Sequence, residues 1–373
     1  MGKGAITGLF YTCFVTGTAL LAAATVAASY AGRFHPAESF VMPLLGLALP
    51  FLLVACLLVA FGWWLRRSWW TLLPLAAFFA SWNYLTTIFR WPYSEKVQVE
   101  SAQRLKVATY NVAHFGGEIT GYSCREIARM MEEEGVDVLC LQECGSSPSF
   151  PMDSVRQVFS HWPYALFPTL ESEEDLLTMA VLSLYPLKGD TLITFEGTAN
   201  CSMMCDVLCG EDTLRLFNSH LQTTSVSQNR KKWERELMAD DSRRETKAVK
   251  DAAETLHGNL LKRAAQADSL AACIRRSPYP VLFCGDLNSL PSSYTYYKIS
   301  SLLEDGFRTA GHGYMYTYRN AKRLLRIDYA FHSAELTAVD YRSPGWKLCS
   351  DHNPVLLEVA LPQSEIPLEQ AEK

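Results

Sequence analysis

Hydrophobic and polar residues follow two different patterns along this chain. Three long apolar stretches come first, at Ala5–Tyr30, Phe40–Leu65 and Trp69–Phe89, with short polar breaks between them. From about residue 105 onward, short apolar runs alternate with polar turns and with amphipathic segments. Long apolar stretches are typical of membrane helices, whereas short apolar runs bounded by turns predict buried strands. The pattern therefore predicts a helical membrane segment followed by an α/β domain.

Each apolar stretch has roughly the 20 residues that a helix needs to cross the hydrocarbon core of a bilayer. Four tryptophans flank the short turn between the second and third stretches, as expected at a membrane interface: Trp63, Trp64, Trp69 and Trp70. The first stretch is long for a signal peptide and has no clear small-residue cleavage site. A buried bundle in a soluble protein would need polar faces that these stretches lack. We expect residues 1–92 to form a membrane anchor with three transmembrane helices, embedded through residues 5–89.

Charge divides the chain near the same boundary. The first 90 residues contain five Lys or Arg residues and one Glu, out of 34 basic and 39 acidic residues in the whole chain. By the positive-inside rule, Lys3, Arg66 and Arg67 favour a cytoplasmic amino terminus and a cytoplasmic second turn. The third helix would then lead to the outer side of the membrane. We therefore expect an integral protein of the bacterial inner membrane whose following domain is periplasmic.

The rest of the chain alternates strand-like and helix-like segments. Strands are predicted at residues 105–112, 136–143, 179–185, 192–195, 202–209, 214–220, 280–285, 326–331 and 355–359. A helix is predicted at 124–134, one or two more between 225 and 276, and a short one at 302–307. Strand–helix–strand order is typical of an α/β domain. We place this domain at residues 93–362, followed by an acidic, disordered tail at 363–373.

The chain has 11 cysteines, and none of them forms a CxxC pair. Cys201, Cys205 and Cys209 are compatible with a disulfide, if the domain is exported, and equally with free thiols. The sequence also lacks an HxH cluster. Zinc chemistry is therefore not indicated.

Polar residues stand where the apolar strands end. Eight of them are candidate site residues: Asn111, Glu143, His220, Asp286, Asn288, Asp328, Asp351 and His352. Each alone has an ordinary explanation, such as a turn or a hydrogen-bonded core histidine. Burying so many polar groups without partners would cost several kcal/mol. Functional groups also collect at strand ends in α/β domains, so we expect these side chains to converge on one site.

The residue types suit the hydrolysis of a phosphate ester. Carboxylate oxygens such as those of Glu143 hold a hard divalent ion, Mg²⁺ or Mn²⁺. Such an ion neutralises a phosphate and stabilises charge on the leaving oxygen. A carboxylate or a histidine takes a proton from the attacking water, while a protonated histidine binds the developing negative charge. A second carboxylate behind that histidine fixes its tautomer and keeps it cationic.

Six motifs carry a resemblance to a known family. In chain order they are Thr109-Tyr110-Asn111-Val112, Leu141-Gln142-Glu143, Asn218-Ser219-His220-Leu221, Gly285-Asp286-Leu287-Asn288, Ile327-Asp328-Tyr329 and Ser350-Asp351-His352. This series resembles the endonuclease/exonuclease/phosphatase superfamily, which includes deoxyribonuclease I, abasic-site endonucleases, inositol polyphosphate 5-phosphatases and neutral sphingomyelinases. The resemblance covers about residues 105–359 and not the membrane segment. It implies an α/β fold of the deoxyribonuclease I type, a four-layer α/β sandwich in which two sheets pack together with helices outside.

The resemblance also implies a role for each candidate. The implied metal ligands are Asn111, Glu143 and Asp351, with Glu143 as the principal one. The implied catalytic residues are His220, Asp286, Asn288, Asp328 and His352.

Among the implied catalytic residues, Asp286 resembles the group that orients or deprotonates water, and Asn288 resembles a phosphate contact. His352 resembles the phosphate-binding histidine, and Asp328 its partner. His220 resembles the second histidine of the nuclease and sphingomyelinase branches. At Leu184-Tyr185-Pro186 the chain departs from many relatives, which have Arg before Tyr-Pro. A basic substrate contact at that position is therefore in doubt.

The expected function is that of a membrane-anchored, divalent-metal-dependent phosphoesterase that uses in-line attack of water. The membrane anchor, together with the run Ser219-His220-Leu221-Gln222, favours a phospholipid or a lipid-linked phosphate as substrate. An extracytoplasmic endonuclease or exonuclease is the alternative, disfavoured by the acidic balance and by the lack of interleaved aromatic and basic residues. A non-catalytic membrane-bound binding module is an alternative of another class. A transporter is less favoured still, because no apolar stretch carries an internal charge. The oligomeric state is left open.

Overall fold

The computed structural model describes residues 3–91, 103–117, 120–168, 178–224, 242–320 and 322–362. Contacts divide the chain into two compact units. The first, which we call the helical unit, comprises residues 1–89, 222–271 and 288–299. The second, the sandwich unit, comprises residues 90–221, 272–287 and 300–373. The apolar amino-terminal segment therefore shares a unit with two segments from the second half of the chain.

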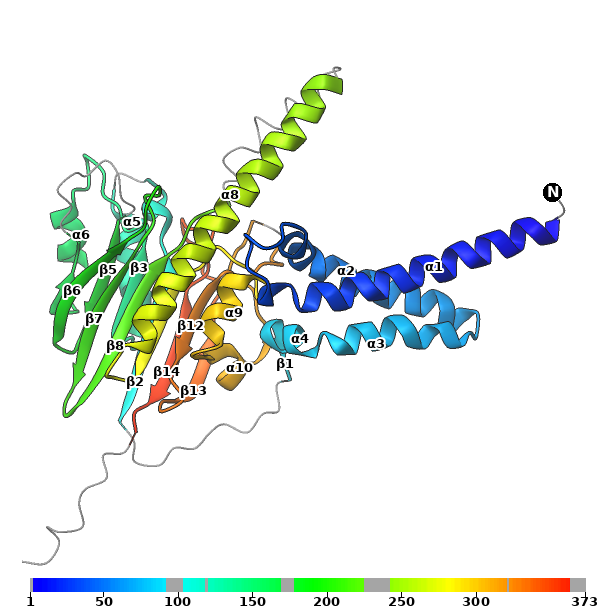
Figure 1. Cartoon of the computed structure of the whole chain (residues 1–373). Coiled ribbons are helices and arrows are strands. Elements are labelled where there is room, and N and C mark those ends of the chain that lie inside the picture. Colours follow the sequence, from blue (N-terminus) through cyan, green and yellow to red (C-terminus); the bar gives the residue numbers. More distant parts are fainter. Residues whose placement is uncertain are drawn as a thin grey trace, which may run out of the picture. The chain divides into compact units, whose positions relative to one another are not determined.

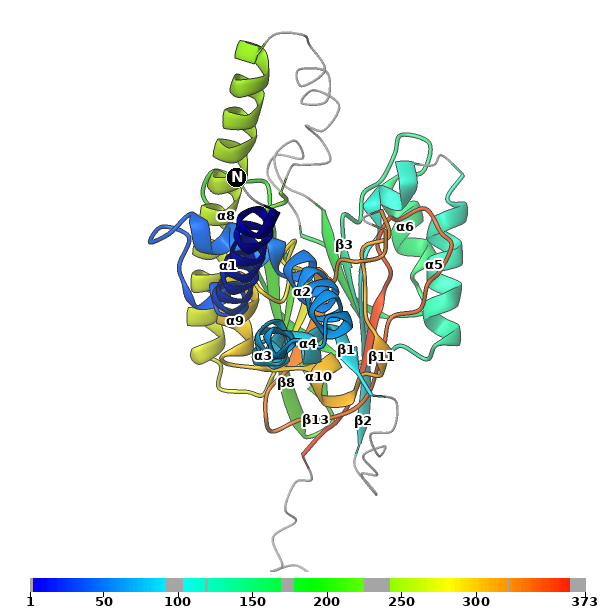
Figure 2. The same cartoon turned by 90° about the vertical axis from the view of Figure 1, so that its right-hand side faces the viewer.

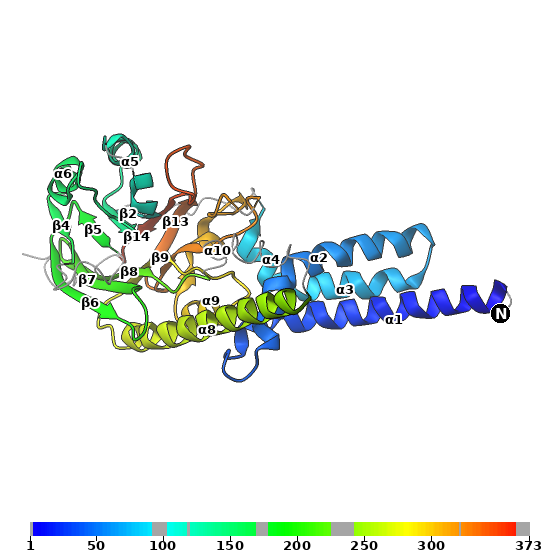
Figure 3. The same cartoon turned by 90° about the horizontal axis from the view of Figure 1, so that it is seen from above.

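The amino-terminal part of the helical unit is a bundle of helices. Its members are α1 (Lys3–Ser29), α2 (Val41–Leu65), α3 (Leu72–Ala80) and α4 (Trp82–Ile88), with the short 3₁₀ turns η1 (Ala31–Arg33) and η2 (Trp69–Thr71) between them. The first three helices run side by side (Figure 3). Polar groups join α1 to α2 inside the bundle, because Trp63 Nε1 donates a hydrogen bond to Thr18 Oγ1 over 2.9 Å.

Two helices, over Gly8–Ser29 and Val41–Leu65, are long and apolar enough to cross a membrane. The third predicted span is not one continuous helix, because α3 ends at Ala80 and α4 begins at Trp82. The hydroxyl of Ser81, between them, donates to the carbonyl of Ala77 over 3.2 Å. Serine side chains that bond the backbone in this way often bend helices. Of the three predicted spans, two are therefore candidates by length and composition among the described residues, and the third is not.

The helical unit also contains most of α8 (Ser242–Arg275) and α9 (Tyr294–Ser300). The predicted helical region between residues 225 and 276 is therefore a single long helix where it is described, seen in yellow-green in Figure 1. The run of basic residues between Arg230 and Arg235 and the acidic tail lie outside the described residues.

The sandwich unit is built from two six-stranded sheets. The first, called the β2 sheet, has the order β13 (Thr337–Arg342), β14 (Val355–Ala360), β2 (Arg104–Asn111), β3 (Val138–Gln142), β5 (Met179–Ser183) and β4 (Tyr164–Leu166). The second, the β9 sheet, has the order β10 (Glu304–Asp305), β12 (Asp328–His332), β9 (Val281–Asp286), β8 (Asp212–His220), β7 (Cys201–Cys209) and β6 (Leu187–Thr194). Only β2–β3 and β8–β9 pair in parallel within these sheets.

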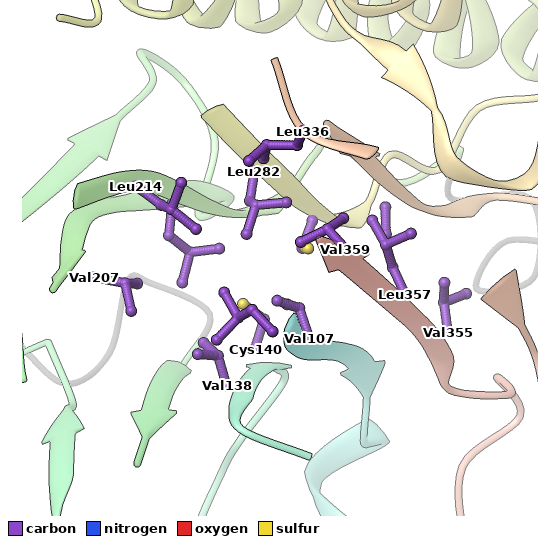
Figure 4. Close-up of a cluster of buried hydrophobic side chains, with 14 of the residues drawn as sticks. Val107, Val138, Cys140, Val207, Leu214, Leu282, Leu336, Val355, Leu357 and Val359 are labelled. Atoms are coloured by element: carbon purple, nitrogen blue, oxygen red, sulfur yellow. The ribbon is translucent and has the colours of Figure 1, made fainter. Parts of the chain in front are cut away.

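The main hydrophobic core lies between the two sheets. Val107 and Cys140 of the β2 sheet meet Leu214 and Leu282 of the β9 sheet in one buried cluster (Figure 4). Such close packing of two apolar faces is what the alternating strand patterns predict. The expectation of two packed sheets in an α/β fold is confirmed.

A second core covers the outer face of the β2 sheet. Leu139 and Leu141 of β3 pack there with Ile127 of α5 (Tyr122–Glu133) and Val155 of α6 (Met152–Val158). The helices α5 and α6 lie beside one another (Figure 2). Burial of apolar side chains on both faces explains why β3 reads as a continuous apolar run in the sequence.

All nine predicted strands are present, with ends shifted by a few residues. Two further strands were not predicted. β4 is short and largely exposed, and β13 carries charged residues such as Asp340 and Arg342. The predicted short helix at 302–307 is instead β10 followed by α10 (Gly306–Ala310). The remaining short elements are η3 (Ala113–Gly117), β1 (Phe89–Arg90) and β11 (Gly313–Tyr314).

The cysteines settle one alternative that the sequence left open. Cys201, Cys205 and Cys209 are all free thiols on β7, with their side chains in the core between the sheets. Burial raises the pKa of the Cys205 thiol to about 12. These thiols therefore act as small apolar core side chains.

Candidate active site

Strand pairing places the candidate residues at one end of the sandwich. In the β2 sheet, Asn111 pairs with Gln142, the residue before Glu143. In the β9 sheet, Asp286 pairs with His220 on one side and with Asp328 on the other. The side chains predicted from three separate strands of this sheet are thus direct neighbours.

Asn111 connects the two sheets at this end. Its Nδ2 donates to Glu143 Oε1 and to Asp286 Oδ2, each over 3.1 Å. Its Oδ1 accepts from the backbone N–H of Ala113 over 3.1 Å, which fixes the orientation of the amide. His220 Nε2 lies 3.7 Å from Glu143 Oε1 and 3.7 Å from Asp286 Oδ2. Glu143 and Asp286 therefore share two polar neighbours.

His352 lies between carboxylates. Its Nδ1 is 2.9 Å from Asp328 Oδ2, and its Nε2 is 3.8 Å from Asp286 Oδ2 and 3.9 Å from Asp351 Oδ1. Burial by itself would lower the pKa of His352, but the negative charges of Asp328, Asp286 and Asp351 and the hydrogen bond to Asp328 raise it to about 10. The ring is therefore an imidazolium at neutral pH, with Nε2 directed at the other carboxylates.

Exposure separates the acidic groups into two kinds. The Asp286 and Asp328 side chains are 1% exposed, whereas those of Glu143 and Asp351 are 25% and 38% exposed. Solvent reaches the site over Glu143 and Asp351. An ion or a substrate that binds here would have to approach from the same direction.

Backbone conformation also shapes the site. Glu143 and Asn288 adopt left-handed conformations, with φ values of 50° and 48°, which are uncommon for residues other than glycine. Gly285 has φ 145°, and a Cβ there would lie 1.9 Å from the carbonyl oxygen of Ser219. Gly285 lies within β9, where the lack of a side chain lets the backbone of β8 approach closely.

Two supporting residues were given no role in the sequence analysis, although Ser350 stands in one of the six motifs. Thr317 Oγ1 accepts from the backbone N–H of Ile327 and of Asp328, over 3.0 and 3.1 Å. The Ser350 hydroxyl donates to the carbonyl of Asn111 over 2.6 Å and accepts from the N–H of His352 over 3.0 Å. These contacts join segments far apart in the chain, so neither periodicity nor spacing predicts them.

A buried amide pair lies behind the site. Gln142 Nε2 donates to Asn218 Oδ1 over 2.6 Å and to Thr109 Oγ1 over 2.9 Å. Asn218 Nδ2 donates to the carbonyls of Leu141 and Ala180, over 3.0 and 2.9 Å. In the sequence, this pair could have been found only from the presence of one polar residue in each of two apolar strands. The pair links the β2 sheet to the β9 sheet directly behind the candidate residues.

His114 is a further neighbour that the sequence analysis passed over. Its Nε2 lies 3.8 Å from Glu143 Oε2, and its side chain is half exposed. It follows β2 in a left-handed turn, with φ 51° at His114 itself.

The ring of Tyr318 also borders the site. It lies edge-on to the ring of His352, with 5.1 Å between the ring centroids.

Asn288 is placed differently from the other seven candidates. It belongs to the helical unit, although it follows Asp286 by only two residues. Its backbone carbonyl accepts a hydrogen bond from Arg263 of α8. The other seven candidates lie in the sandwich unit and are connected by the contacts given above.

The donor set fits a hard divalent cation. Four carboxylates lie among three imidazoles at this site, so negative charge is in excess, and no thiol takes part in these contacts. The donor atoms of Asp286, Asp328 and His352 lie within 4.8 Å of one another. His352 Nδ1 and Asp328 are already hydrogen-bonded to each other, so this buried group serves better as a charge pair than as an ion site. The solvent-facing oxygens of Glu143 and Asp351 are the better ligands.

Two family models match separate parts of the chain. The model described as the endonuclease/exonuclease/phosphatase family matches residues 108–352, which include all eight candidates. A family described as a domain of unknown function matches residues 11–88. No curated protein matches the chain significantly.

Solved structures share the fold of the sandwich at low sequence identity. An endonuclease/exonuclease/phosphatase from Beutenbergia cavernae is 15% identical, with a TM-score of 0.50 over 70% of this chain and 72% of that one. One from Bacteroides vulgatus is 14% identical, with a TM-score of 0.50 over 69% of this chain and 99% of that one.

Proposed function

Because the chain belongs to the endonuclease/exonuclease/phosphatase family, whose members are metal-dependent phosphoesterases and nucleases, we propose that it is a membrane-anchored hydrolase of phosphate esters. One observation carries the proposal above all. The three buried side chains of Asp328, His352 and Asp286, called the line Asp328–His352–Asp286, hold the imidazolium of His352 next to the carboxylate of Asp286. Asn111 hydrogen-bonds both this carboxylate and that of the more exposed Glu143.

Each group in this arrangement has a distinct task. The imidazolium of His352, held by Asp328, presents Nε2 to a phosphoryl oxygen and stabilises the negative charge that develops there. Asp286 accepts a proton from the attacking water, and Asn111 and His220 orient its carboxylate. Glu143 and Asp351, with Asn111 beside them, would hold Mg²⁺ or Mn²⁺. A bound ion neutralises the phosphate and the leaving oxygen.

The helical unit supports a location in the membrane. Many large apolar side chains of α2 are exposed, among them Phe51 and Leu58, at 68% and 66%. Apolar surface of this extent is unfavourable in water and suits a lipid environment. Lys3, Arg66 and Arg67 favour a cytoplasmic side for the α2–α3 turn. The sandwich unit would then face the periplasm.

A phospholipid or a lipid-linked phosphate is the substrate class that this location favours. Anchoring raises the effective concentration of the site for substrates held in the same membrane. A nuclease outside the cytoplasm is the alternative within the same chemistry. The alternative of another class is a non-catalytic binding module, which would have the same fold but would hydrolyse no substrate.

The test is hydrolysis by the full-length protein, purified in detergent and reconstituted into vesicles. The panel holds phosphatidylinositol phosphates, sphingomyelin, a generic phosphomonoester, a generic phosphodiester and single- and double-stranded DNA. Each is assayed with Mg²⁺, with Mn²⁺ and with chelator. We expect metal-dependent turnover of a lipid phosphate that is lost in His352→Ala. Turnover of DNA alone would select the nuclease alternative.

A matched pair of variants separates chemistry from folding. Glu143→Gln alters the proposed ion ligand, and Glu335→Gln alters an exposed glutamate after β12. We expect the first to lose turnover at low metal concentration and the second to behave as the wild type. A folded wild-type protein that binds no divalent metal and turns over none of the substrates would sink the hydrolase proposal and favour the binding module.

A further inference from the structure

A strained turn of the sandwich unit places His114 beside Glu143. Four successive residues, from Ala113 to Gly116, have a left-handed backbone, with φ values of 47°, 51°, 52° and 71°. In this turn the backbone N–H of His114 donates to the carbonyl of Glu143 over 2.9 Å. Glu143 is left-handed as well, with φ 50°. Such conformations persist only where the surroundings impose them, and they cluster at ligand sites.

The turn is packed on two sides. Phe115 is buried in the core on the outer face of the β2 sheet, with its ring centroid 6.4 Å from that of Phe159. On another side, a Cβ on Gly116 would lie 2.7 Å from the Cβ of Cys349, two residues before Asp351. The backbone at His114 is therefore held between the outer core and the segment that carries Asp351.

Gly145 makes room for the imidazole of His114. A Cβ on Gly145 would collide with Nδ1 of His114. Gly145 does not have a positive φ, so its lack of a side chain serves this space and not an unusual backbone conformation. Its N–H donates to the carbonyl of Glu143 over 2.9 Å, beside the bond from His114. Residues 143–145 and His114 thus form one fixed arrangement.

The two carboxylate oxygens of Glu143 have different neighbours. Oε1 accepts from Asn111 Nδ2 over 3.1 Å and lies 3.7 Å from Nε2 of His220, whose side chain is only 3% exposed. Oε2 lies 3.8 Å from Nε2 of His114, whose side chain is 49% exposed. An ion that enters from solvent therefore meets Oε2 and the His114 imidazole together.

The separation of these two atoms fits a shared ion. A distance of 3.8 Å is too long for a hydrogen bond between Nε2 and Oε2. Two ligand atoms that each lie about 2.1 Å from one ion are about 3.0 Å apart at a right angle and about 4.2 Å apart on opposite sides. The observed distance lies within that range, so both atoms can contact one ion without a large movement.

We propose that His114 is a further ligand of the ion that Glu143 holds, and that its imidazole makes the site favour Mn²⁺ over Mg²⁺. The inference rests on the proposed function, in which Glu143 is an ion ligand. Mg²⁺ prefers oxygen ligands and keeps several waters, so it gains little from a nitrogen donor. Transition-metal dications bind imidazole more strongly than Mg²⁺ does, whereas the carboxylates beside it suit both ions. His114 is thus the residue that discriminates between them.

The first test measures ion binding without turnover, on the full-length protein in detergent. The variant is His114→Asn, because asparagine tolerates a left-handed backbone. The control is His161→Asn, at an exposed histidine outside the site. Electron paramagnetic resonance of the unbound ion gives the Mn²⁺ affinity, and competition against Mn²⁺ gives that of Mg²⁺.

We expect the wild type to bind Mn²⁺ at least about tenfold more tightly than Mg²⁺. His114→Asn should lose about 10–100-fold in Mn²⁺ affinity and less than about threefold in Mg²⁺ affinity, since water replaces the imidazole on Mg²⁺ at little cost. His161→Asn should match the wild type for both ions. Equal losses for the two ions in His114→Asn, or no loss for either, would overturn the inference.

Pulsed electron paramagnetic resonance of the bound Mn²⁺ tests the nitrogen ligand directly. We expect the wild type and His161→Asn to show a nitrogen coupling from a coordinated imidazole, and His114→Asn to lose it. A coupling that persists in His114→Asn would assign the nitrogen to another histidine and contradict the proposal.

A pair of glycine variants tests the placement of the ring with every ligand retained. Gly145→Ala puts a methyl group where the His114 imidazole lies. Gly345→Ala puts one 3.9 Å from the Tyr316 hydroxyl oxygen, which is an ordinary contact. We expect Gly145→Ala to lose Mn²⁺ affinity as His114→Asn does and Gly345→Ala to keep it. Wild-type Mn²⁺ affinity in Gly145→Ala would show that the ring position does not matter to the ion.

The outcomes separate this inference from the proposed function. A folded wild type that binds neither ion and hydrolyses no substrate overturns the proposed function itself. Metal-dependent turnover in a protein that binds Mg²⁺ as tightly as Mn²⁺, with no change in His114→Asn, leaves the hydrolase intact and overturns only the role of His114.

Discussion

The two sheets of the sandwich contribute to the site in different ways. The β9 sheet supplies His220, Asp286 and Asp328, all of which lie within strands and are placed by register. The β2 sheet supplies Asn111 from a strand, whereas Glu143 and His352 lie on the segments beyond strand ends. The β9 sheet therefore fixes all three of its groups by backbone pairing, whereas the β2 sheet fixes only Asn111 in this way.

Burial follows the same division. Asp286 and Asp328 of the β9 sheet are almost inaccessible, whereas Glu143 and Asp351 of the β2 sheet side reach solvent. Buried carboxylates interact strongly with a nearby charge, because water does not screen them. Exposed carboxylates can exchange an ion without desolvating the site. In the proposed mechanism, the β9 sheet would therefore set the charge state of the site, and the β2 side would receive the ion.

His352 is the residue where the two sides meet, so its loss should have the largest effect. It lies just before β14 of the β2 sheet and bonds Asp328 of the β9 sheet. We expect His352→Ala to lower kcat about 10³–10⁴-fold, because both the phosphate contact and the imidazolium charge are lost. Steady-state kinetics measure this change in kcat, with the substrate that the hydrolysis panel identifies. His161→Ala, an exposed histidine outside the site, is the control. Equal activity in the two variants would remove His352 from the mechanism.

Asp328→Asn tests the buried side alone. The change keeps the shape of the side chain and removes the charge that holds His352 cationic. We expect kcat to fall about 10²–10³-fold with the Mg²⁺ requirement unchanged, since the ion belongs to the other side. A metal titration of activity checks both parts. A raised metal requirement with unchanged kcat would place Asp328 among the ion ligands and contradict the division between the sheets.

Glu143→Gln tests the exposed side. We expect the Mg²⁺ concentration for half-maximal activity to rise about 10–100-fold, because a charged ligand is replaced by a neutral one. At saturating Mg²⁺ much of the activity should return, since the line Asp328–His352–Asp286 is intact. Isothermal titration of the protein with Mg²⁺ gives the same comparison without turnover. Unchanged metal affinity would show that the ion is held elsewhere.

The strand-end residues could be predicted from the sequence because each lies just before, at the edge of or just after a short apolar run, and such a run predicts a buried strand. Seven of the eight candidates meet in the sandwich unit for this reason. Asn288 could not be placed in the same way, because the hydrogen bond from Arg263 to its carbonyl joins distant parts of the chain. The amide pair of Gln142 and Asn218 was hidden for the same reason.

The third apolar stretch shows a different limit of sequence reasoning. Hydropathy measures how apolar a segment is, and it does not report whether the backbone stays helical. The hydroxyl of Ser81 bonds the carbonyl of Ala77 where α3 ends, although the flanking residues are apolar on both sides. Thr18 and Thr25 make the same kind of bond inside the continuous helix α1, so a hydroxyl residue within an apolar run does not by itself predict such a break.

The smallest expected effects come from two residues three positions apart on one segment. Thr317 supports buried Asp328 by accepting its backbone N–H, and Asn320 supports exposed Asp351 by donating to Oδ2 over 3.0 Å. Thr317→Val leaves two buried N–H groups without this acceptor, so we expect a loss of about 1–3 kcal/mol in unfolding free energy and about fivefold in kcat. Asn320→Ala removes an exposed bond and should change kcat by less than about twofold. Chemical denaturation measures the unfolding free energy of the two variants, and steady-state kinetics measure their kcat. If Asn320→Ala proves the more damaging, the exposed side depends on fixed geometry as much as the buried side does, and burial is not what distinguishes the sheets.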